Sequence, residues 1–255
     1  MTDDVYVALG SSFAAGPGIL PVLDRTALRS GRNYPQLAAD TLGLRLVDVT
    51  SSGATTVHLL REQQGRARPQ LEAVGPEARL VTVTAGGNDL SYVGGLITAS
   101  VRGWVARRLP GPVRGLVAGT PVPVSPDAYR AVAASLAEVV SEVRARAPRA
   151  RVLLVDYLTL IGPDTVAGRD VPLDEAWLGW ARETAAGLAG AFARAADESG
   201  ARLVAASEAS AGHGLGSSQP WVGGFRFGNP RRGGPVPYHP NAEGMAAVAA
   251  LVAGT

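Results

Sequence analysis

A serine stands directly after a short apolar run near the start of the chain. The run Val5–Leu9 is typical of a buried strand, and Gly10-Ser11-Ser12 follows it. In open α/β sheets ligands bind at the carboxyl ends of the strands, so this order places the Ser12 hydroxyl at such an edge. Gly16 and Gly18 then allow the backbone to turn sharply beside it. Ser12 is therefore a candidate nucleophile, although a serine after a glycine is also typical of an ordinary turn.

Two further segments contain candidate donors for an oxyanion. Ser51–Thr55 follows the second strand-like run and contains Gly53, whose backbone N–H lies at the same expected sheet edge. Thr84–Asp89 follows the third run and contains Asn88, whose side chain carries an NH₂ donor. Acyl transfer by serine needs donors of this kind for the charge that develops on the carbonyl oxygen. Taken singly, Gly53 fits a turn, and Asn88 with Asp89 fits a turn and a helix cap.

The candidate base is His239, in the run Tyr238–Gly244. Pro240 restricts His239 to an extended conformation and begins the last predicted helix, so the imidazole is fixed just ahead of a helix N-terminus. A surface histidine is the alternative interpretation. The chain has three histidines. Of the others, His58 falls in a predicted helix after the second strand, and His213 falls in a long loop.

Strand-like and helix-like runs alternate along the chain, which predicts a parallel sheet with helices on both faces. The predicted strands are Tyr6–Leu9, Arg45–Val49, Leu80–Thr84, Val152–Val155 and Arg202–Ala205. The predicted helices are Tyr34–Leu42, Asp127–Ala147, Asp174–Ser199 and about Asn241–Val252, each with cap or stop signals at its ends.

Two segments interrupt this alternation. Leu90–Pro126 contains one apolar stripe at helical spacing with arginines beside it, which fits an amphipathic flap, a membrane-touching element or, as the favoured interpretation, a surface helix packed on the domain. The stripe consists of Ile97, Val101, Trp104 and Val105, beside Arg102, Arg107 and Arg108. Ser207–Tyr238 is rich in Gly, Ser and Pro, and Trp221, Phe225 and Phe227 within it favour an ordered, pocket-lining loop.

Composition limits the function classes. At 255 residues we expect one domain over 1–255, with an insertion at about 90–126 and a substrate loop at about 207–238. The chain has no Lys and no Cys, which excludes Schiff-base chemistry, thiolate nucleophiles and Cys-ligated metals. The formal net charge is only +2 and the arginines are scattered, so we expect no nucleic-acid partner. No cofactor and no metal are expected, and a monomer is favoured.

The start of the chain is acidic, and no apolar leader segment follows it. Together with the lack of cysteine, this favours the cytoplasm, with secretion as the alternative if a leader has been removed. No apolar run reaches the length of roughly 18 to 20 residues that a membrane span requires.

Together the four segments resemble the SGNH, or GDSL-type, hydrolase superfamily, in order and spacing over nearly the whole chain. Gly10–Gly16 resembles the block that holds the nucleophile, at Ser12. Gly53 corresponds to the glycine of the second block, Gly86–Asp89 to the third block, and His239 to the histidine of the last block. The run from Gly212 to Val222 is similar to the actinobacterial esterase and lipase branch.

The resemblance implies a fold, a reaction and roles for the site residues. The fold is a three-layer flavodoxin-like α/β/α sandwich with a five-stranded parallel sheet of order 2-1-3-4-5. The reaction is hydrolysis of a carboxylic ester through an acyl-enzyme, with Ser12 as nucleophile and His239 as general base. The oxyanion hole comes from the Ser12 N–H, the Gly53 N–H and the Asn88 side chain. The substrate is a small-molecule or lipid ester.

The sequence departs from the family pattern at two positions. Ser11 replaces the family's aspartate, which leaves a second hydroxyl as a rival nucleophile. Val236 stands where the acid of the triad is expected, and no carboxylate occurs between Ala209 and Asn241. We therefore expect the Val236 backbone carbonyl to accept the Nδ1–H of His239 and fix its tautomer. Asp156, at the end of the fourth predicted strand, is the rival orienting group, or else it caps the next turn.

Three functions remain open at this point. The first is a serine esterase, and the second is an acyltransferase that uses the same Ser12 and His239 pair to pass the acyl group to an alcohol. Product analysis with an acceptor alcohol distinguishes these two. The third, motivated by the missing acid, is a non-catalytic ligand-binding relative, and covalent labelling of Ser12 by a fluorophosphonate would count against it.

Overall fold

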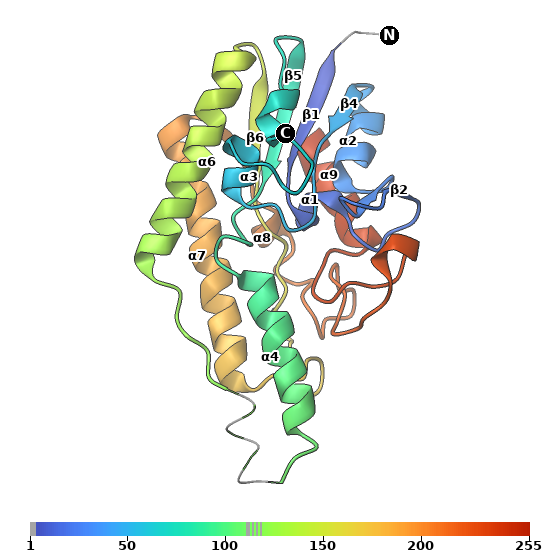
Figure 1. Cartoon of the computed structure of the whole chain (residues 1–255), viewed down its shortest axis with the longest axis vertical. Coiled ribbons are helices and arrows are strands. Elements are labelled where there is room, and N and C mark those ends of the chain that lie inside the picture. Colours follow the sequence, from blue (N-terminus) through green and yellow to red (C-terminus); the bar gives the residue numbers. More distant parts are fainter. Residues whose placement is uncertain (1–3, 111–112, 114, 116, 118) are drawn as a thin grey trace.

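Five parallel strands form the central sheet in the computed structural model, which describes residues 4–110, 113, 115, 117 and 119–255 (Figure 1). They are β1 (Val5–Gly10), β4 (Arg45–Asp48), β5 (Ala78–Thr84), β6 (Arg151–Val155) and β7 (Arg202–Val204). The order across the sheet is β4-β1-β5-β6-β7, so the five strands counted along the chain lie in the order 2-1-3-4-5 and confirm the expected topology. Every residue of β1 is buried, as expected for a central parallel strand covered on both faces.

Helices cover the sheet in two groups, and Figure 1 shows them on either side of the strands. The helix α2 (Tyr34–Leu42) packs against α9 (Ala242–Ala253), whereas α6 (Pro126–Arg146) packs against α7 (Glu175–Ser199) and α3 (Thr56–Leu60). The predicted bounds of these helices hold to within about a turn because their ends carry strong local signals. Asn33 caps α2 by accepting from the Gln36 N–H, and Gly43 ends it with φ 66°.

Several short elements escaped sequence analysis because they have no periodicity to detect. They are α1 (Ser12–Ala15), the hairpin of β2 (Val22–Asp24) and β3 (Arg29–Ser30), η1 (Gln70–Ala73), α8 (Ala206–Ala209) and η2 (Pro230–Arg232). Two of them, α1 and η1, lie beside the candidate nucleophile.

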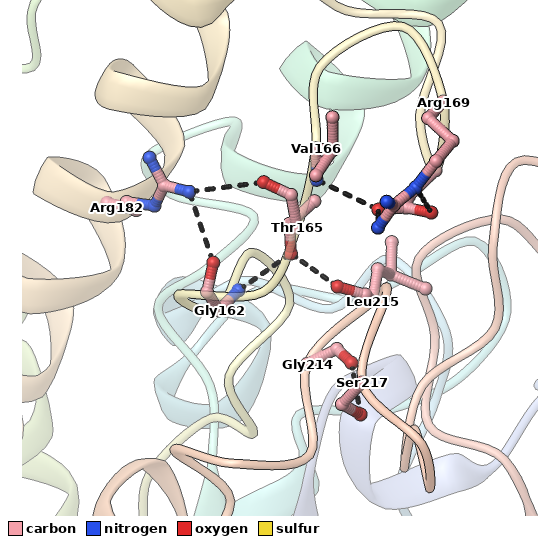
Figure 2. A network of polar contacts seen from close by, with 9 residues as sticks. Gly162, Thr165, Val166, Arg169, Arg182, Gly214, Leu215 and Ser217 are labelled. Atoms are coloured by element: carbon pink, nitrogen blue, oxygen red, sulfur yellow. Dashed lines mark hydrogen bonds and ion pairs between the residues drawn. The ribbon is translucent and has the colours of Figure 1, made fainter.

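A polar network fixes residues 214–217, between the short elements α8 and η2 of the segment Ser207–Tyr238 (Figure 2). The buried Thr165 hydroxyl donates to the Leu215 carbonyl at 2.5 Å and accepts from the Gly162 N–H at 3.0 Å. Arg182 of α7 donates to the Gly162 carbonyl at 3.1 Å, which ties the network to a long helix. A Cβ on Gly214 would lie 2.7 Å from the Gly162 nitrogen, so the two loops touch closely where both residues are glycine. These contacts fix the path of the loop that leads to His239.

The helix α4 (Tyr92–Ala106) follows β5 and extends beyond the carboxyl edge of the sheet (Figure 1). Its buried face packs toward α7, and a Cβ on Gly103 would lie 2.1 Å from the Pro172 carbonyl oxygen. The helix packs on the domain, as the favoured interpretation expects, and Ile97 of the stripe is partly buried against the core. The other three members of the stripe face outward: Trp104 is 49% exposed, Val101 42% and Val105 38%. Among the described residues, no helix combines the length and apolar character needed to cross a membrane.

Candidate active site

The structure brings Ser12 and His239 together across 227 positions of sequence. Ser12 is the first residue of α1, directly beyond the end of β1, and His239 lies just ahead of α9. The Ser12 Oγ and the His239 Nε2 are 2.9 Å apart, and both side chains are buried. This is the distance of a hydrogen bond that can carry a proton between the two groups.

The second ring nitrogen of His239 decides which tautomer is present. Nδ1 lies 2.8 Å from the Pro237 carbonyl oxygen, which can only accept a hydrogen bond. Nδ1 therefore carries the proton, and in the neutral ring Nε2 keeps a lone pair for the Ser12 hydroxyl. We expected the Val236 carbonyl, one residue earlier, to be this acceptor. That expectation is wrong: Tyr238, between Pro237 and His239, has a left-handed backbone conformation, and the Pro237 carbonyl is the one that contacts the ring.

Tyr238 is the residue with this backbone conformation. Its φ is 60°, a left-handed conformation that is unusual for a bulky side chain and costs roughly 1 to 2 kcal/mol. The side chain is fully buried, and its hydroxyl contacts Ser100 Oγ of α4 at 2.5 Å. Its ring also stacks near Phe225, with centroids 6.1 Å apart. Burial and this hydrogen bond hold the strained conformation that places the adjacent imidazole.

The backbone on both sides of His239 pairs with the long loop. The Gly223 N–H donates to the His239 carbonyl at 2.8 Å, and the Tyr238 N–H donates to the Gly223 carbonyl at 3.0 Å. On the other side, the Asn241 N–H donates to the Trp221 carbonyl at 3.0 Å. The Asn241 side chain also caps α9 by accepting from the Gly244 N–H. The imidazole is therefore fixed by a short antiparallel ladder and a helix cap rather than by a carboxylate.

Burial lowers the pKa of the His239 imidazole to about 4, and the hydrogen bond to the Pro237 carbonyl opposes only a part of this effect. Phe13 contributes to the apolar surroundings, since its ring centroid lies 5.6 Å from that of His239. The neutral form is thus the resting form at neutral pH, ready to accept a proton from Ser12.

Ser11, the rival nucleophile, points to a different partner. Its Oγ lies 3.2 Å from the Tyr157 hydroxyl, which also accepts the Gly87 N–H at 3.0 Å. Tyr157 thereby links the turn that holds Ser12 to the glycines that precede Asn88. Burial raises the pKa of the Tyr157 phenol to about 12, so it stays neutral and able to donate.

Gln70 of η1 fixes the last residue of β1. Its side-chain carbonyl accepts from the Gly10 N–H at 2.7 Å, and its NH₂ donates to the Gly10 carbonyl at 3.0 Å. A Cβ on Gly10 would lie 2.7 Å from the Thr84 carbonyl oxygen, so only glycine fits there without displacing β5. Nothing local in the sequence marks Gln70, because its partner is 60 positions away. Tyr157, by contrast, is the second residue after the predicted strand Val152–Val155, so its position after a strand end was a signal that could have identified it.

The candidate oxyanion donors lie on adjacent turns. Gly53 has φ 84°, a left-handed backbone conformation that favours glycine. The turn that contains Gly53 is bound to the segment Gly86–Asp89, because the Asp89 carboxylate accepts hydrogen bonds from both the N–H and the hydroxyl of Thr56. The Asn88 NH₂ donates one hydrogen to the Ala54 carbonyl at 2.8 Å, which leaves its second hydrogen free for another acceptor. The amide of Ser12 is at a helix N-terminus and so has no intrahelical acceptor.

Asp156, the rival orienting group, binds elsewhere. Its two oxygens accept from the Ser207 N–H at 2.8 Å and from the Ser207 hydroxyl at 2.5 Å, at the start of α8. Burial raises the pKa of this carboxyl to about 6, against the lowering effect of the Ser207 contacts. Its observed contacts are those of a strand-end cap.

The two remaining histidines also have other partners. His58 Nδ1 lies 2.7 Å from Thr55 Oγ1, in a capping box at the start of α3. His213 stacks on Trp221 with ring centroids 3.8 Å apart, and its Nδ1 contacts the Gln219 carbonyl.

A cavity of about 670 Å³ lies next to the turn that precedes Gly53, but Ser12, Gly53, Asn88 and His239 are not among the residues that line it. Ser51 lines one side of it, and the segment 64–70 lines another, ending at Gln70. Gln64 binds the turn that contains Gly53, because its side-chain NH₂ donates to the Ser52 carbonyl at 2.8 Å. The predicted pocket-lining loop Ser207–Tyr238 contributes to a different cavity of about 590 Å³, which Leu215, Val222 and Phe225 line together with Arg107.

Comparison with known proteins gives a consistent match. The model of the GDSL-like lipase/acylhydrolase family matches residues 8–247. A curated relative, Lipase 2 of Streptomyces coelicolor, is 37% identical over 248 residues, covering 94% of this chain and 81% of that protein. A lipase of Streptomyces rimosus is 28% identical over 249 residues, covering 94% of this chain and 82% of that protein.

Solved structures have the same fold. The phospholipase A1 of Streptomyces albidoflavus NA297 superposes with a TM-score of 0.71 at 23% identity, covering 96% of this chain and 97% of that one. The extracellular lipase of Streptomyces rimosus superposes with a TM-score of 0.67 at 26% identity, with the same coverage. The chain therefore belongs to the GDSL-like lipase/acylhydrolase family and is a carboxylic ester hydrolase.

Proposed function

We propose that this protein hydrolyses carboxylic esters through an acyl-enzyme formed on Ser12, with His239 as the general base. The observation that supports this most directly is the 2.9 Å contact between Ser12 Oγ and His239 Nε2, made while Nδ1 is bound to the Pro237 carbonyl. In this arrangement the base is in the correct tautomer before substrate arrives, so little reorganisation is needed.

The reaction runs in two halves. The Ser12 oxygen attacks the ester carbonyl carbon while its proton passes to His239 Nε2, giving a tetrahedral oxyanion. This collapses as the C–O bond to the alcohol breaks, and the leaving oxygen takes the proton from Nε2. A water then attacks the acyl-Ser12 carbonyl, gives its proton to Nε2, and the C–O bond to Ser12 breaks with return of that proton. The carboxylic acid leaves and the enzyme is regenerated.

The oxyanion is assigned to three donors: the N–H of Ser12, the N–H of Gly53 and the second side-chain N–H of Asn88. Removing one such donor costs about 100- to 1,000-fold in kcat in other serine hydrolases. The carbonyl that orients His239 carries no full charge, so it stabilises the imidazolium less than a carboxylate does. We therefore assign more of the rate enhancement to the oxyanion donors than in a full triad.

The test compares two neighbouring serines. Ser12→Ala is expected to reduce kcat/KM for p-nitrophenyl acetate by roughly 10⁴-fold or more and to abolish labelling by a fluorophosphonate. Ser11→Ala is the matched control, since it removes an equally buried hydroxyl one residue away, and it should keep activity within about tenfold. Labelling that persists in Ser12→Ala but is lost in Ser11→Ala would assign the nucleophile to Ser11.

The compartment is the remaining point. The structural relative from Streptomyces rimosus is described as an extracellular lipase, and no comparison supports the cytoplasmic placement expected from composition. We infer that secretion fits this protein better than the cytoplasm.

A further inference from the structure

We propose that the exposed face of α4 docks the protein onto an anionic lipid surface. Val101, Trp104 and Val105 stand at positions i, i+3 and i+4 near the end of α4, and Arg108, two residues beyond that end, lies over the Trp104 ring. Two further arginines are close in the chain: Arg102 lies within α4, and Arg107 is its C-cap. We call these six residues the α4 surface. The proposal concerns docking and is independent of the catalytic assignment.

The apolar members are exposed to an extent that packing on the domain does not explain. Trp104 is 49% exposed, Val101 42% and Val105 38%. The same helix has a separate buried face, which already makes the contacts with α7 and with the Tyr238 hydroxyl. It consists of Tyr92, Val93, Leu96, Ala99, Ser100 and Ala106. A contiguous exposed apolar group of this kind marks an interaction site.

Positive charge around the α4 surface favours a negatively charged partner. Between Asp89 and Asp127 the sequence contains four arginines and no acidic residue. Arg108 lies over the Trp104 ring with its Cζ 3.6 Å from the centroid, so a cation and an aromatic ring are presented together. Trp beside Arg is the pairing that favours the lipid headgroup region, where the ring is half in apolar surroundings and the cation meets phosphate.

The acidic side chains nearest in the loop that supports α4 are already engaged. Asp170 is paired with the side chain of Arg169, and Asp174 caps α7 by accepting from the Trp177 N–H. Arg107 donates to the Gly168 carbonyl in this loop, which braces the helix. No ion pair joins Arg102, Arg107 or Arg108 to a carboxylate among the ion pairs of the described residues.

The direction of α4 determines which end of the molecule would face a bound bilayer. The helix extends from the carboxyl edge of the sheet, which is the edge that carries Ser12 (Figure 1). A bilayer that contacts the α4 surface therefore faces the same end of the molecule as the site. The bond between Ser100 and Tyr238 also connects α4 directly to the residue before His239.

The experiment measures binding to vesicles in the Ser12→Ala background, so that lipid is not consumed and loss of catalysis does not affect the readout. Co-sedimentation with phosphatidylcholine vesicles is compared with vesicles that also contain phosphatidylglycerol. We expect binding only when phosphatidylglycerol is present, weakening as salt is added. Trp104→Ser should lower the partition coefficient roughly tenfold or more, because an aromatic ring no longer enters the interface.

Charge is tested with paired substitutions. Arg102→Gln with Arg108→Gln should weaken binding roughly thirtyfold, about fivefold for each cation removed from the surface. The matched control is Arg45→Gln with Arg151→Gln, which removes two exposed arginines from the amino ends of β4 and β6, at the opposite edge of the sheet. This control should bind within about twofold of the parent. Near-ultraviolet circular dichroism checks that each variant is folded.

Three results would overturn the proposal. The first is no binding to vesicles that contain phosphatidylglycerol at low salt. The second is equal loss of binding in the α4 pair and in the control pair, which would mean that only net charge matters. The third is a dimer that Trp104→Ser dissociates while vesicle binding is absent, which would make a second copy of the chain the occupant of this surface.

Discussion

Protonation of His239 offers a direct test of how the site works. Burial holds the pKa of this imidazole at about 4, compared with an ordinary value of 6.5. A difference of about 2.5 in pKa corresponds to about 3 kcal/mol that disfavours the imidazolium. Since the neutral ring is the base in the proposed mechanism, the acid limb of the pH profile of kcat/KM should move to lower pH with this pKa.

The expected profile differs strongly from that of an ordinary histidine. At pH 5 about 90% of the enzyme should carry a neutral His239, against about 3% if the pKa were 6.5. The value of kcat/KM at pH 5 should therefore be nearly that at pH 7, with half of the activity lost near pH 4. The same shift makes unfolding easier in acid, because the unfolded chain gains this proton below about pH 6.5 while the folded chain resists it until about pH 4.

The assay follows p-nitrophenyl acetate hydrolysis from pH 3.5 to 8 at the wavelength where nitrophenol and nitrophenolate absorb equally, so that ionisation of the product does not distort the rate. Near-ultraviolet circular dichroism at each pH separates titration from unfolding. A half-maximal rate between pH 6 and 7 in folded protein would refute the reasoning, because it would mean that the ring is solvated or that an unassigned carboxylate stabilises its cation.

Four further substitutions test the supporting groups. Asp156→Asn should leave kcat/KM within about twofold, and loss of turnover in a folded variant would make Asp156 the orienting group in place of the Pro237 carbonyl. Gln70→Leu leaves the N–H and the carbonyl of Gly10 without their side-chain partners, so denaturant unfolding should show a loss of roughly 2 to 6 kcal/mol. Gly10→Ala should cost roughly 1 to 3 kcal/mol in the same measurement, because its Cβ overlaps the Thr84 carbonyl. Tyr238→Phe should lower kcat more than it raises KM, and an unchanged kcat would remove the Tyr238 hydroxyl from the positioning of the adjacent imidazole.

Local sequence patterns were sufficient to predict the strands of the sheet and the long helices. Alternating apolar runs and cap residues such as Asn33 and Gly43 report the local backbone conformation, and they do so within a few residues of each element. The strand order followed from the family resemblance, which also supplied the roles of the strand-end residues. Chain order alone placed Ser12, Gly53 and Asn88 after successive strands, and parallel strands present their carboxyl ends at one edge.

The tertiary structure decided which groups meet at that edge. The choice of the Pro237 carbonyl over that of Val236 depends on a left-handed residue at Tyr238, and burial against α4 and Phe225 holds that conformation.

The sequence by itself determined the elements and the types of side chain available for chemistry, because those depend on residues a few positions apart. Only the tertiary structure decided that Gln70 fixes Gly10, that Ser11 contacts Tyr157, and that three members of the stripe on α4 face outward. The physical reason is that each depends on contacts between segments distant in the chain, whose free energy no local pattern encodes.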